Sequence, residues 1–242
     1  MIPNLLHQIW YQGSDNIIEP YKSCYDKTLI FLKNTKWKHV FWDKNKIDKF
    51  IKKYYNQYWD LYDGYDILVQ KLDIARYLIL YHYGGCYMDM DMEMIKDFRE
   101  LINDDTLIVS KMAIGIINNG ILFSSKNNIF WLDFLNKINE NKNKFNFNKM
   151  LHVNFTTGPL HFNNFINTSD YKIKILPHHY LEAQTSKYDS KDKIDAYTIN
   201  HFGNSWIDPT YNIFIYLYQY RKIVLIIIVI IILFFIMHKI IV

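Results

Sequence analysis

Residues 66–95 read DILVQKLDIARYLILYHYGGCYMDMDMEMI, and this stretch decides the fold of the 242-residue chain. Its first half predicts an amphipathic helix from Ile67 to Tyr83, because apolar side chains recur there at steps of three and four residues. The residues of this apolar stripe are Leu68, Leu72, Ala75, Ile79 and Tyr83. Gly84 and Gly85 follow, and two glycines in succession predict the end of the helix.

The second half of the stretch changes to a period of two residues, which is typical of a strand. The two alternating sets are Cys86, Met88, Met90, Met92 and Met94 on one side and Tyr87, Asp89, Asp91 and Glu93 on the other. We therefore expect one strand with a sulfur-rich core face and an acidic outer face. Carboxylates at two-residue steps repel one another, so the acidic row should face open water or hold a cation. Oxygen ligands of this kind suit magnesium, manganese or calcium better than zinc.

The predicted helix carries a polar pair that indicates the kind of ligand. Asp73 and Arg76 are three residues apart and meet on one helical face, where the carboxylate would hold the guanidinium in place. A guanidinium matches the geometry of phosphate oxygens, and a cation on the acidic strand would neutralise further negative charge. Together these groups predict a site for a ligand with both hydroxyls and phosphates, such as a nucleotide diphosphate.

The same residues resemble a known family. The pattern of the DXD-containing sugar transferases is Asp, two residues, Arg-Tyr, then Tyr-Gly-Gly, then Tyr-x-Asp-x-Asp. This glycosyltransferase family 32-like group includes the yeast initiating α-1,6-mannosyltransferases and the inositol-phosphoceramide mannosyltransferases. Every position is met here, by Asp73, Arg76, Tyr77, Tyr83, Gly84, Gly85, Tyr87, Asp89 and Asp91. A lone Asp-x-Asp would carry little weight, whereas the combined pattern is specific. The rival interpretation is a buried helix–strand pair with a solvated acidic edge.

The resemblance implies an α/β fold with a GT-A-like nucleotide-binding sheet flanked by helices. It also implies Mn²⁺ or Mg²⁺ as cofactor, with Asp89, Asp91 and His201 as the metal ligands. The catalytic residues that it implies are Asp73, Arg76 and Asp91. The donor-binding residues that it implies are Trp10, Asp73, Arg76, Tyr87, Asp89, Asn118, Ser205 and Trp206.

Several of these residues also have a plain structural interpretation. Trp10 ends a predicted strand, Ile2 to Trp10, and a core tryptophan at a strand end is as good an account of it as base stacking. Asn118 and Asn119 precede a glycine in an expected loop or hairpin, and an Asn-Gly turn explains Asn119. His201 fits the family through its four-residue spacing to Ser205-Trp206, against the alternative of a histidine without metal.

The rest of the large domain shows further elements of an α/β protein. Residues 20–43 predict a helix and then a strand, Lys38 to Trp42, an order that suits a parallel sheet. Thr156-Thr157-Gly158-Pro159 predicts a helix start with a threonine cap; the family has Thr-Gly-Pro here beside the acceptor cleft, although capping suffices to explain it. Other predicted elements are a strand at Thr106–Ser110, a helix at Ile129–Ile138 and a strand at Lys172–Leu176.

Composition excludes some classes of protein. Half of the residues are hydrophobic and 17% are aromatic, so a disordered chain is not expected. The net charge of +4 is mild and spread out, which gives no support for nucleic-acid binding.

The C-terminus predicts a membrane anchor. Residues 223–237 are apolar without interruption, and the stretch to Val242 would span roughly 30 Å as a helix if Lys239 snorkels. We therefore divide the chain into a glycosyltransferase domain (1–210), an aromatic and basic juxtamembrane segment (211–222) and a transmembrane helix (223–242). Arg221-Lys222 and the lack of an N-terminal signal pattern predict a single-pass, tail-anchored protein whose catalytic domain faces the cytosol.

The function expected from these features is a metal-dependent transfer of a hexose, with retention, from a UDP- or GDP-linked sugar to a lipid or glycan acceptor. The hexose could be mannose, glucose, galactose or N-acetylglucosamine. Two alternatives remain open, a metal-dependent phospho- or nucleotidyltransferase and an inactive membrane-bound module that binds sugar nucleotides.

Overall fold

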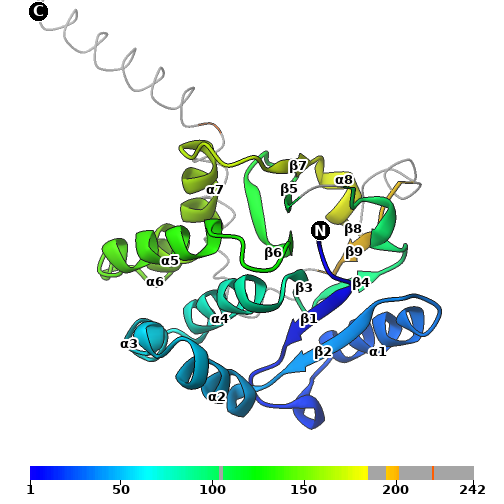
Figure 1. Cartoon of the computed structure of the whole chain (residues 1–242), viewed down its shortest axis with the longest axis horizontal. Coiled ribbons are helices and arrows are strands. Elements are labelled where there is room, and N and C mark those ends of the chain that lie inside the picture. The colour runs from blue at the N-terminus through cyan, green and yellow to red at the C-terminus, as the bar shows by residue number, and fades with distance from the viewer. Residues whose placement is uncertain (104–105, 185–194, 202–219, 221–242) are drawn as a thin grey trace, which may run out of the picture. The chain divides into compact units, whose positions relative to one another are not determined.

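The computed structural model describes residues 1–103, 106–184, 195–201 and Tyr220 (Figure 1). The chain divides into two units, Met1–Asn204 and Ser205–Val242, and the first holds every described residue except Tyr220. Its helices are α1 (Tyr21–Leu32), α2 (Lys44–Tyr54), α3 (Trp59–Asp63), α4 (Leu68–Tyr83), α5 (Phe130–Asn141), α6 (Lys149–Thr156), α7 (Pro159–Asn167) and α8 (His178–Leu181). Its strands are β1 (Leu5–Ile9), β2 (Lys38–Trp42), β3 (Gly85–Met88), β4 (Met92–Met94), β5 (Leu107–Lys111), β6 (Ile117–Ser124), β7 (Lys174–Leu176), β8 (Ala183–Gln184) and β9 (Thr198–Asn200).

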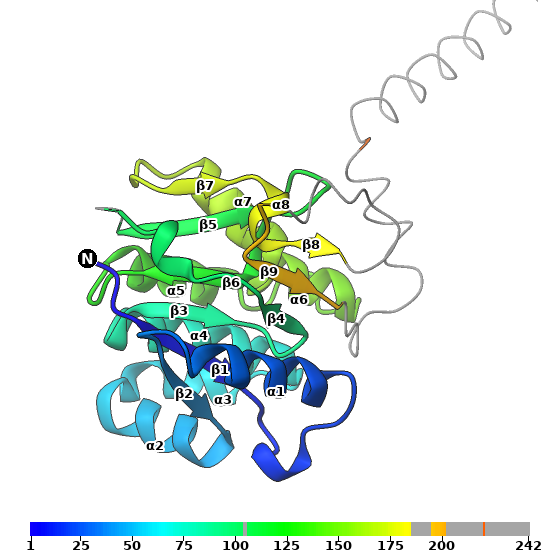
Figure 2. The ribbon, with the colours of Figure 1, turned by 90° about the vertical axis from the view of Figure 1, so that its right-hand side faces the viewer.

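A six-stranded sheet in the order β2-β1-β3-β6-β5-β7 forms the centre of the first unit (Figure 2). β1 runs parallel to β2 and β3, whereas β6 runs antiparallel to both β3 and β5. The α/β prediction is therefore confirmed, and the parallel order expected from residues 20–43 holds for β1 and β2 within a mixed sheet. A smaller sheet has the order β4-β9-β8.

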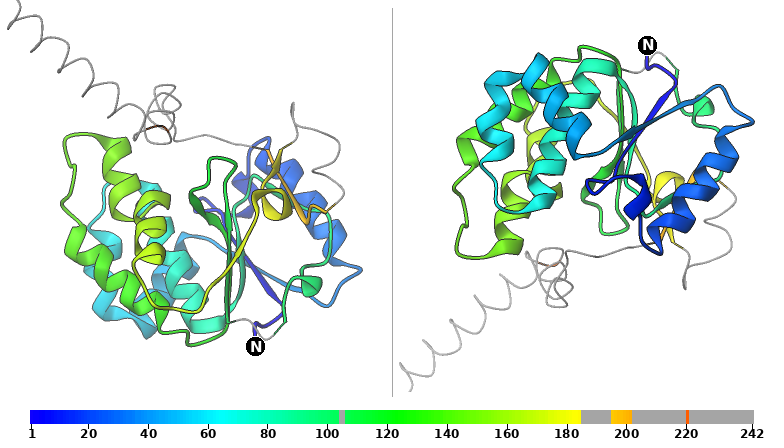
Figure 3. Two further views of the ribbon diagram at one scale, coloured as in Figure 1. Left: turned by 90° about the horizontal axis from the view of Figure 1, so that it is seen from above. Right: turned by 90° about the horizontal axis from the view of Figure 1, so that it is seen from below.

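The two faces of the large sheet bury separate hydrophobic clusters. Helices α2 to α7 cover one face, and α1, α8 and the small sheet cover the other (Figure 3). The molecule therefore has three layers, with the mixed sheet between helices, as the expectation of a helix-flanked sheet requires. No helix within the described ranges combines the length and the apolar character needed to cross a membrane. The predicted anchor and juxtamembrane segment, residues 211–242, lie outside those ranges except for Tyr220.

The predicted central helix is confirmed almost to the residue, as α4, but its buried surface is wider than one stripe. α4 contacts β1, β3 and β6 of the sheet and also α5, so residues 73–80 are all buried, including Asp73 and Arg76. The helix ends where predicted, because Gly84 and Gly85 have φ angles of 66° and 98°, a region that favours glycine. A Cβ on Gly85 would come within 2.5 Å of the Leu5 carbonyl oxygen, so this pair of glycines also lets β3 approach β1.

The single acidic strand predicted after the glycines is wrong. β3 ends at Met88, the chain turns through Asp89 to Asp91, and β4 continues in the small sheet. The Met92 amide closes the turn by donating to the Asp89 carbonyl at 3.2 Å. The sulfur-rich face is nevertheless buried throughout, because the turn keeps all four methionine side chains in the core. Tyr87, expected on the outer face, is only 2% exposed.

Two further expectations are corrected. Asn118 and Asn119 lie inside β6 and not in a loop or turn, because β6 pairs with β5 from Ile117 onward. Helix α7 does start with Pro159 in its first turn, but its N-cap is Gly158 and no threonine side chain caps it.

Candidate active site

The candidate site lies where β3 ends. Asp89 follows the last residue of β3 at the carboxyl end of the strand, and Trp10 follows the neighbouring parallel strand β1. Helix α4 runs back toward the start of β3, so its N-terminal half lies at this same edge of the sheet (Figure 2). In α/β sheets the carboxyl ends of parallel strands are where ligands commonly bind.

Arg76 is the centre of the polar network. Its guanidinium lies 3.2 Å from the Asp73 carboxylate and 3.3 Å from the Asp89 carboxylate, and it donates to the Asn119 carbonyl at 2.8 Å. It also stacks over the ring of Tyr87 at 4.5 Å from the ring centroid. Arg76 is 4% exposed, and its Nε has no hydrogen-bond partner among the described residues. The guanidinium is therefore fixed by several partners, while one of its buried donors stays unpaired within the described ranges.

Asp73 is held by more than the guanidinium. Thr157 Oγ1 donates to one carboxylate oxygen at 2.7 Å, and Asn119 Nδ2 donates to the other at 3.0 Å. Burial raises the pKa of Asp73 to about 6, although Arg76 and the hydrogen bond from Thr157 oppose the rise. Burial acts to lower the pKa of Arg76, but the charges of Asp89, Tyr87 and Asp73 raise it on balance.

Tyr77, the residue after the arginine, anchors this network to the core. Its hydroxyl donates to the Thr157 carbonyl at 2.8 Å and accepts from Asn119 Nδ2 at 2.9 Å. Its ring stacks on Trp131 and Phe162 with interplanar angles of 12° and 14°. In the Arg-Tyr pair of the motif, Arg76 therefore binds the carboxylates of the site, and Tyr77, on the same turn of α4, packs into the aromatic core.

Asp89 sits at the open side of the network. Its side chain is 37% exposed, and Tyr87 OH donates to its Oδ1 at 2.6 Å, the same oxygen that Arg76 approaches. Its backbone amide donates to the Gly120 carbonyl at 2.8 Å. A Cβ on Gly120 would lie 2.7 Å from Asp89 Oδ2, so a glycine there leaves space for the carboxylate.

Asp91 and His201 are brought together by the small sheet. β4 pairs antiparallel with β9, and the His201 amide continues the ladder by donating to the Asp91 carbonyl at 2.9 Å. The His201 ring makes a 3.0 Å contact with Glu93, which also accepts from Lys27 at 2.9 Å. Within the described residues, no group of three or more histidine, cysteine, aspartate or glutamate side chains is arranged to hold a metal ion. The metal role of Asp89, Asp91 and His201 stays a prediction.

Glu182, which the sequence did not mark, lies beside the same turn. It caps α8 and is 5% exposed; Asn118 Nδ2 donates to one of its oxygens, and Asn200 Nδ2 donates to the other at 2.9 Å. Burial raises the pKa of Glu182 to about 7, the two asparagines oppose the rise, and the charges of Asp91 and Asp89 add to it. A buried carboxyl therefore lies close enough to both aspartates of the motif for their charges to raise its pKa.

Comparison with known proteins finds a family match for part of the chain. Residues 20–108 match the family described as "Glycosyltransferase sugar-binding region containing DXD motif". This match assigns residues 20–108, and only that part of the chain, to the family. An uncharacterized glycosyltransferase of Acanthamoeba polyphaga mimivirus is 41% identical over 103 residues, which is 42% of this chain and 40% of the relative. Inositol phosphoceramide mannosyltransferase 1 of Schizosaccharomyces pombe is 31% identical over 185 residues, 73% of this chain and 56% of the relative.

The resemblance to DXD-containing glycosyltransferases predicted from the sequence is thus confirmed, and the chain spans about half the length of these two curated relatives. A solved glycosyltransferase involved in the glycosylation of the major capsid of PBCV-1 shares the fold, with a TM-score of 0.52 at 11% identity. That match covers 82% of this chain and 93% of the other.

The structure describes two of the four remaining residues that we predicted to bind the donor, Trp10 and Asn118. Trp10 is partly exposed; its indole donates to the Asn16 carbonyl at 2.9 Å, and its ring lies 4.9 Å from that of Tyr21. Asn118 is turned to Glu182. Ser205 and Trp206 lie outside the described residues.

Sequence reasoning missed two residues of the network. Thr157 was visible in the Thr-Gly-Pro motif, but a cap explained it locally, and only the fold shows that its hydroxyl reaches Asp73, 84 positions away. Glu182 follows a His-His-Tyr-Leu segment that has no recognisable pattern, so no local signal could have found it.

Proposed function

We propose that this chain is a metal-dependent glycosyltransferase that moves a hexose from a nucleotide-diphosphate sugar to a lipid or glycan acceptor, with retention of configuration. The observation that carries the proposal is the position of Arg76, a buried guanidinium fixed between Asp73 and Asp89 with one donor unpartnered among the described residues. Such a preorganised donor is suited to the charge that grows on a leaving diphosphate. Mannose is the favoured hexose, because the Schizosaccharomyces pombe relative is named a mannosyltransferase.

The proposed cofactor is Mn²⁺ or Mg²⁺, held by Asp89 and Asp91 with His201 as a third ligand. The donor set fits a hard cation, because Tyr87 and Arg76 both approach Oδ1 of Asp89, so Oδ2 remains the natural ligand atom. The contact between His201 and Glu93 would orient the imidazole, as carboxylates commonly do for metal-bound histidines. The ion would supply Lewis-acid neutralisation of the diphosphate.

The residues of the chain would then act on the donor by position and charge. Arg76 would stabilise the leaving diphosphate, and Asp73, fixed by Thr157 and Asn119, would hold the guanidinium and accept from sugar hydroxyls. The acceptor oxygen forms the new bond to the anomeric carbon as the bond to the phosphate oxygen breaks, and the acceptor proton passes to that phosphate oxygen. No separate protein base is required for this step. Trp10, Tyr87, Asn118, Ser205 and Trp206 are proposed to line the donor.

A ligand screen on the full chain in mild detergent tests the proposal. UDP- and GDP-linked sugars should raise the melting temperature only with Mn²⁺ or Mg²⁺, because a ligand that binds the folded state stabilises it. The best donor should also be hydrolysed slowly, and Asp91→Ala should abolish both effects. Asp170→Asn, a change at an exposed aspartate, is the matched control and should keep both. Turnover of nucleoside triphosphates without turnover of nucleotide sugars would instead favour a nucleotidyl- or phosphotransferase, and binding without any turnover an inactive module.

We further propose that residues 223–242 anchor the enzyme in a membrane, with the catalytic domain in the cytosol. The uninterrupted apolar run supports the anchor. Two glycosylation sequons test the orientation, and they differ in accessibility: Asn154 is fully buried, whereas Asn167 is exposed. A glycan on Asn167 in cells would place the domain in the lumen and refute this topology.

A further inference from the structure

The segment that joins α5 to α6 exposes aromatic side chains to water. Residues 142–149 read KNKFNFNK, and every one of them is exposed. Phe147 is 84% exposed and Phe145 is 38% exposed. Single exposed apolar side chains are ordinary, but two phenylalanines in one exposed turn form an apolar patch, and such patches commonly mark an interaction surface.

The fold holds the two phenylalanines in place. The ring of Phe145 lies 5.0 Å from that of Phe155 on α6 and 6.1 Å from that of Phe147. The His152 ring donates to the Lys144 carbonyl at 2.7 Å, which fixes the backbone just before them. Phe145 has a φ of 57°, a left-handed conformation that a bulky residue rarely adopts. The chain therefore accepts local strain in a turn that leaves the second ring in water.

Positive charge surrounds the two rings. Lys142, Lys144 and Lys149 lie in the segment, and the sequence holds no acidic residue from 141 to 169. Glu140, just before the segment, is engaged in an ion pair within α5. A bilayer that contains anionic lipids matches both properties, because its headgroups attract lysines and an apolar layer lies directly beneath them. An acidic protein surface is complementary to the charge alone.

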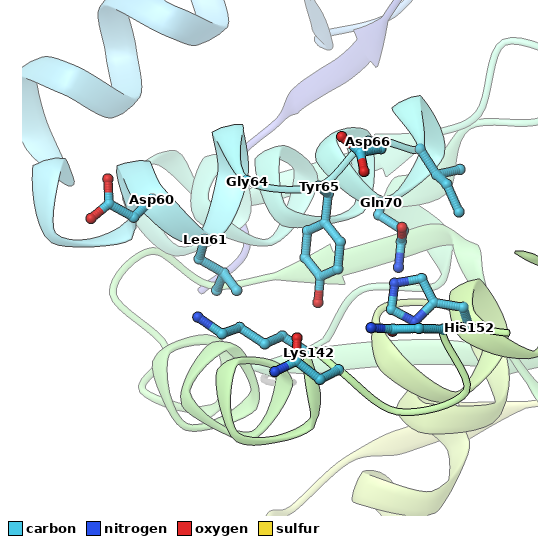
Figure 4. Close-up of a pocket in the computed structure, with 11 residues that line it drawn as sticks. Asp60, Leu61, Gly64, Tyr65, Asp66, Gln70, Lys142 and His152 are labelled. Carbon is cyan, nitrogen blue, oxygen red and sulfur yellow. The ribbon is translucent and has the colours of Figure 1, made fainter.

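The segment is a neighbour of the helix that carries the candidate site. Lys142 lines a recess of about 410 Å³, and Figure 4 shows it across from Tyr65 and Gln70 at the N-terminal end of α4. Gln70 lies about one helical turn before Asp73. A surface that holds the segment would therefore lie beside the half of α4 that bears Asp73 and Arg76.

We propose that residues 142–149 dock on the surface of an anionic bilayer, with Phe147 in the interface, Phe145 behind it and the three lysines at the headgroups. This contact is separate from the proposed anchor at 223–242 and does not depend on the proposed transfer reaction. An anchor in the same chain would keep the domain close to the bilayer, so even a weak docking contact would be populated. Docking would fix which side of the domain faces the membrane.

A fluorescent label within the segment tests the docking on the full chain, reconstituted in phosphatidylcholine vesicles with or without phosphatidylserine. Cys24 and Cys86 are buried, so Asn146→Cys provides the accessible thiol for an environment-sensitive NBD dye. The dye emission should shift to the blue and be quenched by nitroxide-labelled acyl chains, more strongly with phosphatidylserine. The same dye on Asn34→Cys, exposed after α1 on the other side of the sheet, is the control and should stay in water.

Two substitutions in the Asn146→Cys chain test whether the patch itself makes the contact. Phe147→Ala should reduce the quenching at an unchanged melting temperature, whereas Ile30→Ala, at a side chain on α1 that is 61% exposed, should leave the quenching as it was. Lys144→Gln should lower the ratio of docked to undocked label about fivefold, as for one lysine removed from an anionic surface.

Two results would overturn the proposal. The first is a label at position 146 that anionic vesicles quench no more than the label at position 34, which would leave the segment as a surface for an acidic protein. The second is quenching that neither Phe147→Ala nor Lys144→Gln reduces, because the contact would then not arise from this patch. Neither result bears on the hydrolysis of a nucleotide sugar, so the proposed function is tested separately.

Discussion

Replacing Thr157 by valine should remove one hydrogen bond from the buried carboxylate of the site and nothing else of comparable size. The threonine hydroxyl donates to Asp73 at 2.7 Å, and Thr157 is fully buried. Valine has nearly the same shape, so no cavity forms. The Thr157 carbonyl still accepts from Tyr77, because that contact involves only the backbone.

The expected loss follows from the charge of the acceptor. A hydrogen bond to a charged group contributes about 1.5–3 kcal/mol, and one to a neutral group about 0.5–1.5 kcal/mol. The pKa of Asp73 is raised to about 6, so the folded protein holds this carboxyl mostly ionised at pH 8 and mostly protonated at pH 5. The variant should thus lose about 1.5–3 kcal/mol of unfolding free energy at pH 8 and roughly half of that at pH 5.

The sign of the pH effect can be checked by linkage. The folded-state pKa of Asp73 lies above its ordinary value of 3.8, so the stability that protonation gives is present at low pH and is lost as the pH rises through about 6. The Thr157 hydroxyl lowers this pKa, so its removal should extend the loss to higher pH. The difference between wild type and variant must therefore grow with pH.

Urea unfolding of the full chain in mild detergent, followed by tryptophan fluorescence at pH 5 and pH 8, measures both values. Thr168→Val is the matched control, because the Thr168 hydroxyl donates to the Asn164 carbonyl on the exposed end of α7. It should cost no more than about 0.5 kcal/mol at either pH. The reasoning fails if Thr157→Val costs no more than the control, or if its cost is the same at both pH values.

Three further predictions concern the other groups of the site. The folded-state pKa of Glu182 is raised from 4.5 to about 7, so the free energy of unfolding should fall by at most about 1.4 kcal/mol per pH unit between these values. Glu182→Gln should make the free energy of unfolding, measured in urea, depend less on pH between pH 6 and 7. An unchanged pH dependence in the variant would contradict the titration of a buried Glu182. Gly120→Ala would place a Cβ 2.7 Å from Asp89 Oδ2, so the carboxylate should rotate away. The rise in melting temperature that Mn²⁺ and the donor produce together should then be smaller than in the wild type. An equal rise would show that Asp89 does not need this space. Arg76→Met should lower the free energy of unfolding in urea at pH 8 by about 3–5 kcal/mol, because it leaves the buried Asp73 carboxylate without its cation. Lys137→Met removes an exposed ion pair and should lower it by no more than about 1 kcal/mol. Similar losses in the two variants would show that the buried pair contributes little.

Local patterns predicted the parts of the site that lie within one element. Helix α4 and its glycine end were predicted within one residue, because helix periodicity and positive φ depend on neighbours in the chain. The Asp73–Arg76 pair was predicted because three-residue spacing alone brings the two side chains together. The alternation after Gly85 correctly predicted that the methionines are buried, but the prediction of one continuous strand was wrong. The turn at Asp89 to Asp91 buries the same side chains as a continuous strand would, so the burial pattern does not distinguish the two.

By itself, the sequence determined the sugar-binding motif, the helix that carries its arginine and the burial of the sulfur-rich face, since each of these follows from spacing along a few turns or strand residues. Only the tertiary structure decided that Asn119 belongs to a strand, that Thr157 and Asn119 hold Asp73, and that Asn118 contacts the buried Glu182. These contacts join residues 46 and 84 positions apart, and Asn118 meets Glu182 across 64. Pairings over such distances are set by how the sheet and helices pack, and no local pattern in the chain encodes them.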